Sequence, residues 1–206
     1  MTTVQAPATT WHTNVHVNGE PYPTRNYTPN TDGLNYDSIG LTPQQANHLT
    51  AIHETGHAIT ALAGGGHLHY AQIGPVANNP SATADAYCCN LVDDNGHAQA
   101  IYYAAGERAA DRWLRETGLW TPRRAVAAEV GAHGDRHKFL SINDHLVGYG
   151  DKPVDYRYVH DLADRVLDQN WDAITRVADA LAQHQHLTGD AIADIAGLPN
   201  GTHFNL

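Results

Sequence analysis

The chain has 206 residues, of which 42% are hydrophobic, and this is enough to bury a single globular core. Its formal net charge of −10 would repel a phosphate backbone, so a nucleic-acid-binding function is excluded. Its apolar runs are too short for a membrane span or a signal peptide, so we expect no membrane partner and a cytoplasmic location.

Residues 1–40 are predicted to form an N-terminal polar arm, distinct from a domain that covers residues 41–206. The arm is rich in Thr, Asn, Pro and Gly and lacks helical periodicity. Within it, the stretch TNVHVNGEPYP at 13–23 can form a short hairpin around Asn18 and Gly19, a residue pair typical of tight two-residue turns.

The first strong helix is predicted over residues 43–63. Thr42 suits the N-cap, Pro43 suits the first helical position, and Gln45 completes a capping box. Three glycines at 64–66 end the helix. Its apolar residues recur at helical spacing, at Ala46, Leu49, Ile52, Ile59 and Leu62.

Two runs of β-type composition follow, HLHYAQIGP at 67–75 and TADAYCCNLV at 83–92, and predict two strands of a small sheet. Helical patterns then recur near 97–117, after Thr121, near 135–147, and from 155 to 185, where one helix or two joined near Asn170 are expected. A closing helix begins after Thr188. The expected fold class is therefore mainly α (α+β), with a small β-sheet.

The stretch AIHETGHAIT at 51–60 contains the candidate metal-binding and catalytic residues. His53 and His57 are one helical turn apart and share a face, so both imidazoles can reach one metal ion. Glu54 is displaced from that face, where its carboxylate can take a proton from a zinc-activated water, as in H-E-x-x-H metalloproteases. The simpler alternative is two histidines on a helix surface or in a core. Fifteen histidines against two cysteines make zinc held by imidazole and carboxylate the best-fitting metal.

A catalytic zinc site needs a third protein ligand, because the fourth position is left to water. The candidates are Glu107, Asp135, Asp144 and several other histidines. Spacing alone does not choose among them.

The same residues resemble the proteolytic domain of the FtsH-type ATP-dependent zinc metalloproteases, in matching order over about residues 42–198. AIHETGHAITAL at 51–62 is similar to the histidine signature of that family, and AAGERAADRW at 104–113 resembles its G-G-R-A-A-E segment. GAHGD at 131–135 resembles its G-A-S-N-D segment. The resemblance implies an FtsH-protease-like helical zincin fold over 41–206, and it implies that Asp135 is the third zinc ligand.

The sequence also departs from that family. We expect a stand-alone domain without the ATPase and membrane parts of that family. Glu107 stands where the family has glycine and, with Asp111 one turn later, resembles the E-x-x-x-D ligand segment of thermolysin-type zincins. Glu107 is therefore the alternative third ligand.

The function expected is that of a zinc-dependent metallopeptidase, with Glu54 as general base and a peptide or protein as substrate. The strand at 83–92 is either an edge along which an extended peptide can pair or an ordinary strand of the sheet. The alternative is a non-catalytic, metal-stabilised binding or regulatory protein with a peptidase-like fold. We expect either assembly with copies of itself, as in the resembled family, or docking to a separate partner protein, as the binding role would require.

Overall fold

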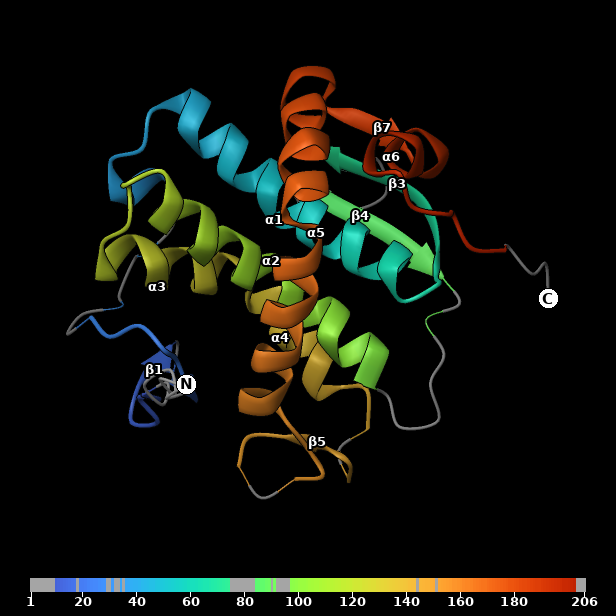
Figure 1. The fold of residues 1–206 in the computed structure, drawn as a ribbon. Coiled ribbons are helices and arrows are strands. Elements are labelled where there is room, and N and C mark those ends of the chain that lie inside the picture. The colour runs from blue at the N-terminus through green and yellow to red at the C-terminus, as the bar shows by residue number, and fades with distance from the viewer. Residues whose placement is uncertain are drawn as a thin grey trace, which may run out of the picture.

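The structure is a computed structural model that describes residues 10–17, 19–28, 31, 34, 36–74, 84–89, 91, 97–143, 145–150 and 152–202. Helices and short strands are mixed, in agreement with the expected α+β class (Figure 1). The helices are η1 (Tyr36–Ile39), α1 (Pro43–Ala63), α2 (His97–Glu116), α3 (Pro122–Gly131), α4 (His133–Leu140), α5 (Tyr156–His184) and α6 (Gly189–Ala196). The strands are β1 (His16–Val17), β2 (Glu20–Pro21), β3 (His67–Ile73), β4 (Ala84–Cys89), β5 (Val147–Gly148), β6 (Val154–Asp155) and β7 (His186–Thr188).

Helix α1 is the central element of the fold. Its predicted bounds and capping box are confirmed, since the Thr42 side chain accepts from the Gln45 amide and the Gln45 side chain accepts from the Thr42 amide. Every residue from Ala51 to Leu62 is buried. Figure 1 shows α5 crossing in front of α1 and α2, while β3 and β4 lie beside the second half of α1. Neighbouring elements thus surround the second half of the helix, whereas the sequence pattern predicted that only one apolar face would be buried.

The sheet beside α1 has three strands in the order β4-β3-β7, all antiparallel. The two predicted strands, β3 and β4, are present and pair with each other. Strand β7 was not predicted, because three residues directly after a long helix carry too short a pattern. Among the described strands β4 has only β3 as a neighbour, so its other edge is unpaired within the described part of the sheet.

Helix α5 runs unbroken through Asn170, which decides between the two arrangements left open by the sequence. The Asn170 amide donates to the backbone carbonyl of Val166 one turn earlier, so its polar group is satisfied without ending the helix.

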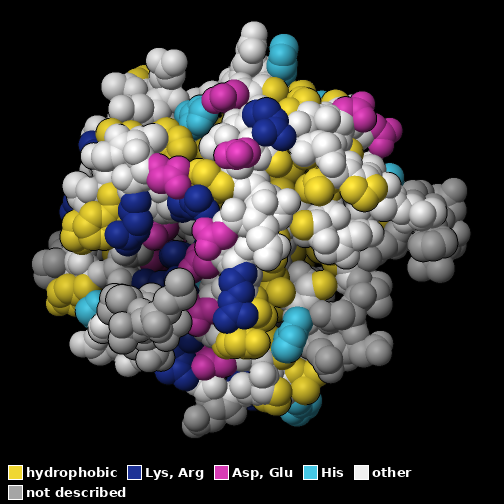
Figure 2. All heavy atoms as spheres, viewed as in Figure 1, with side chains coloured by type: hydrophobic (Ala, Val, Ile, Leu, Met, Phe, Trp, Pro, Cys, Tyr) yellow, Lys and Arg dark blue, Asp and Glu magenta, His cyan; other side chains and the backbone are white. Residues whose placement is uncertain are grey.

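Acidic and basic side chains are mixed on the face of the molecule drawn in Figure 2. Ion pairs between α2 and α5 join Arg108 to Asp164 and Arg112 to Asp168.

The segment near 135–147 is shorter than expected as a helix. Helix α4 ends at Leu140, and the following residues Val147–Gly148 pair in parallel with Val154–Asp155. Neither of these two-residue strands has a local sequence signature. Asp144, one candidate third ligand, lies outside the described residues.

Strands β1 and β2 pair antiparallel, with His16 opposite Pro21 and Val17 opposite Glu20, as the hairpin at 13–23 predicts. Residues 1–9 and Asn18 of the arm lie outside the described part of the chain. Residues 29, 30, 32, 33 and 35 lie outside it as well. The described hairpin does not hang free, because Val15, Val17 and Tyr22 are buried against the domain. Within the described residues, the helices are all too short or too polar to traverse a lipid bilayer.

The close approach of α1 to α2 depends on Gly56. A Cβ at this position would lie 2.8 Å from the carbonyl oxygen of Ala105 and 2.8 Å from the Ala109 Cβ. Overpacking of this kind costs about 1–3 kcal/mol, which exceeds the gain of about 1 kcal/mol in helix propensity. Gly56→Ala should therefore lower the free energy of unfolding, measured by urea denaturation.

Gly134→Ala is the matched control, because it makes the same change in a helix where a Cβ meets no atom within 4 Å. It should leave stability unchanged or raise it by up to about 1 kcal/mol. Equal destabilisation by the two substitutions would contradict the packing assigned to Gly56.

Candidate metal centre

The two histidines of α1 converge on one point. The side chains of His53 and His57 are both buried, and their Nε2 atoms lie 3.0 Å apart. One turn of helix separates the residues, which places both rings on the side of α1 that faces α2 and α4. The geometry expected from the sequence is therefore present, and the rings are not on the protein surface.

Asp135, on α4, completes the group. Its Oδ2 lies 3.1 Å from His53 Nε2 and 3.3 Å from His57 Nε2, although 82 residues separate Asp135 from His53 in the chain. One ligand atom from each of these three residues lies within 4.8 Å of the others, so the group could hold a metal ion.

The separations suit a small tetrahedral ion. Ligand atoms about 2.0–2.1 Å from a tetrahedrally coordinated zinc are about 3.4 Å apart, close to the 3.0–3.3 Å found here. Gly106 on α2 leaves room beside the two rings. A Cβ at this position would lie 2.4 Å from His57 Nε2 and 2.6 Å from His53 Nε2.

The orientation of His57 is fixed from its other side. Its Nδ1 lies 2.6 Å from the backbone carbonyl oxygen of Tyr102, which can only accept, so Nδ1 carries the proton and donates it. When His57 is neutral, its Nε2 therefore presents a lone pair to the centre. His53 Nδ1 is buried and has no hydrogen-bond partner within the described structure.

The negative charge of Asp135 and a positive charge on His57 stabilise each other. Burial alone would raise the pKa of Asp135, but the neighbouring His57 and His53 hold it well below its ordinary range. Burial alone would lower the pKa of His57, but the Asp135 carboxylate raises it to about 9. In the absence of a metal, a proton on His57 thus compensates the buried carboxylate.

Glu54 is buried directly beside the ligands but does not belong to the ligand group. Burial raises the pKa of its carboxyl, and the two nearby imidazoles partly oppose this rise. A carboxyl with a raised pKa can accept a proton and release it again near neutral pH.

A cavity of about 370 Å³ borders the centre, between β4, α2 and α4. Tyr102 lines it and also orients His57, and Lys138, another lining residue, places its Nζ 4.0 Å from Asp135 Oδ1. Other side chains that line it are Asp85, Tyr87, Cys88, Gln99 and Tyr103. Tyr102 and Lys138 thus connect this cavity to the ligand group, although His53, His57 and Asp135 do not line it themselves.

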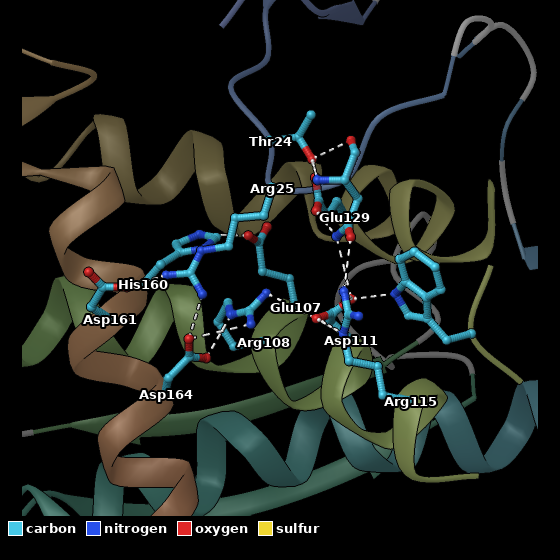
Figure 3. A network of polar contacts seen from close by, with 12 residues as sticks. Thr24, Arg25, Glu107, Arg108, Asp111, Arg115, Glu129, His160, Asp161 and Asp164 are labelled. Atoms are coloured by element: carbon cyan, nitrogen blue, oxygen red, sulfur yellow. Dashed lines mark hydrogen bonds and ion pairs between the residues drawn. The ribbon is translucent and has the colours of Figure 1, made fainter. Parts of the chain in front are cut away.

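The structure places Glu107, the alternative third ligand, away from the two histidines. Its carboxylate accepts from Arg136 at 2.8 and 3.2 Å. Figure 3 shows Glu107 next to His160, whose Nε2 lies 2.7 Å from Glu107 Oε1. Asp111 likewise pairs with Arg108 and Arg115 and orients no histidine of the centre. The prediction of Glu107 as a ligand is thus not supported, because the Arg136 guanidinium neutralises its charge away from the two histidines.

Gly106 and Tyr102 also shape the centre, but the sequence alone did not indicate this for either residue. The small residues around Gly106 indicate a close helix contact, but not that the space is used by imidazoles. The Tyr102 contact uses a backbone carbonyl, which leaves no signature in the side-chain pattern.

No protein-family model matches the chain, and no functionally curated protein is significantly similar to it. The resemblance to the FtsH-type proteolytic domain therefore rests on the motifs alone.

The space beside Gly106 can be tested by filling it. Gly106→Ala would place a methyl group against both Nε2 atoms, so it should abolish metal binding, measured by metal analysis after dialysis against zinc. Gly134→Ala, which adds the same methyl group in open space one residue before Asp135, should retain the metal. Full metal content in Gly106→Ala would contradict the site.

Metal binding should also release a proton. The folded-state pKa of His57, about 9, lies above its ordinary value of 6.5, so its proton stabilises the metal-free protein below about pH 6.5 and this contribution is lost as pH rises through 9. At pH 7 a bound metal must displace that proton. Calorimetric titration with zinc in buffers of different ionisation enthalpy should show release of about one proton, decreasing above pH 9. Binding without proton release at pH 7 would contradict a protonated His57.

Proposed function

We propose that the protein is a zinc-dependent metallopeptidase of the HExxH type, with an FtsH-protease-like helical zincin domain. The convergence of His53, His57 and Asp135 beside the buried carboxyl of Glu54 is the observation that carries this proposal. The order and spacing of the motifs supports the family assignment.

The donor set favours zinc as the metal. Two imidazole nitrogens and one carboxylate oxygen at tetrahedral separations match a catalytic zinc site, in which three protein ligands leave one position open. Zinc held there supplies a Lewis acid that makes a water molecule acidic near neutral pH and polarises a carbonyl group.

Glu54 acts as the general base and then as the general acid. Its carboxylate takes a proton from the attacking water and donates it to the nitrogen of the leaving amine. Burial beside the ligands supports this role, since it raises the pKa of Glu54 toward the value needed to move a proton in both directions.

An extended peptide is the substrate class that the surroundings favour. Strand β4 has an unpaired edge among the described strands, and residues 85–89 of that strand also line the cavity beside the centre. A peptide paired along this edge would place one of its side chains in the cavity and a backbone carbonyl near the ligands.

One observation favours a second candidate, a metal-stabilised binding or regulatory protein without turnover. His53 and His57 are only 6% and 3% exposed, so a metal held there would also join α1 to α4 as a structural metal does. The same three ligands serve both candidates, and Glu54 is what distinguishes them.

Glu54→Gln tests the enzymatic role. It removes the proton acceptor and retains the ligands, so hydrolysis of an unfolded, fluorescently labelled protein should fall about 100-fold or more, while zinc content stays at the parent level. Glu20→Gln makes the same chemical change at an exposed position of β2 and should keep full activity.

If Glu54→Gln cleaved as fast as the parent, the mechanism would be wrong. A parent protein that binds zinc and cleaves no peptide would instead favour the binding role.

A further inference from the structure

Asp135 is held on a short and weakly capped helix. Helix α4 has eight residues, and its N-cap residue, Ala132, makes no side-chain cap hydrogen bond. A helix this short is not stable by itself, so its position depends on tertiary contacts. Whatever fixes α4 therefore also fixes the distance from the Asp135 carboxylate to the two histidines.

Arg136, the next residue after Asp135, is the main polar anchor of α4. Its side chain is 2% exposed and donates to Glu107, to Glu129 at 3.2 Å and to the carbonyl oxygen of Pro23 at 2.7 Å. A buried guanidinium with three separate partners allows little displacement of the helix that carries it.

One of these partners belongs to the N-terminal arm, which contacts α4 on both sides of Asp135. The Tyr22 ring lies 3.8 Å from the Arg136 guanidinium carbon and stacks on the ring of His133 at 6.5 Å between centroids. Tyr22 is 3% exposed, and its hydroxyl donates to the backbone carbonyl of Glu129.

Further contacts hold the arm in place. The Asn26 amide donates to Glu129 Oε1 at 2.7 Å, and Arg25 pairs with Asp161 and Asp164 of α5. Figure 3 shows Thr24 and Arg25 directed from the arm toward this network of charges. Residues 22–26 of the arm are thus tied to α3, α4 and α5, next to the helix that carries Asp135.

We propose that residues 22–26 of the arm position the third metal ligand: Tyr22 and Pro23 hold Arg136, and through it Asp135, at the distance that the histidines require. Tyr22 is a positioning residue, since it does not touch the ligand atoms. The inference rests on the metal centre of the proposed function, but not on peptide hydrolysis.

The test is the affinity of the full chain for Zn²⁺ alone, measured at pH 7 by competition with a chromophoric chelator. Tyr22→Ala should weaken zinc binding about 10-fold or more, the size usual when a group that orients a ligand is lost. Tyr27→Ala is the matched control, because Tyr27 is in the same arm, five residues later, and is 50% exposed. Its zinc affinity should stay within about twofold of the parent.

Ile192→Ala distinguishes positioning of the ligand from a general loss of stability. It removes a buried side chain of α6, the helix that packs on β3 and α5. It should lower stability without weakening zinc binding. If Tyr22→Ala does not fold, Tyr22→Leu keeps a buried apolar side chain, loses the ring, and is judged by the same criterion.

A folded Tyr22 variant with parental zinc affinity would overturn the proposal, as would an equal loss of affinity in Ile192→Ala. A parent protein that binds zinc without hydrolysing peptides would contradict only the peptidase, and a parent that binds no zinc would contradict the centre itself.

Discussion

The structure depends on one arrangement, a carboxylate held against two buried imidazoles that come from a different helix. None of these groups is stable alone in an apolar interior, because a buried charge needs a partner. Around this arrangement, α2 approaches α1 closely enough to need Gly56 and Gly106, and the buried Arg136 guanidinium anchors α4. The fold brings three segments together around this single contact.

The local parts of this arrangement could be predicted from the sequence. The bounds of α1 follow from the Thr42 cap, the proline after it and the terminal glycines, and each of these acts within a few residues. The shared face of His53 and His57 follows from helical geometry alone. Strands β3 and β4 were predictable from their β-type composition, and the cap of α6 from Thr188.

The long-range parts could not be derived in this way. Glu107 and Asp135 are both acidic residues of suitable reach, and the difference is that Arg136 and His160 face Glu107, while the imidazoles face Asp135. Which groups face one another is decided by packing among α2, α4 and α5. Only the family resemblance favoured Asp135. The role of residues 23–26 in the arm was similarly hard to predict, because polar contacts to buried charges hold them and such contacts leave no hydrophobic pattern.

Arg136 joins parts of the chain that are synthesised at very different times. Its partners include Pro23 near the start and Glu107 and Glu129 in the middle, while His160, further on, lies against the same Glu107. A nascent chain that ends before α5 would lack one member of this set, and a half-satisfied buried network is less stable than none. If His53, His57 and Asp135 hold an ion, it would then bind late, to a domain that is already assembled, in contrast to small zinc-finger domains that fold around their metal.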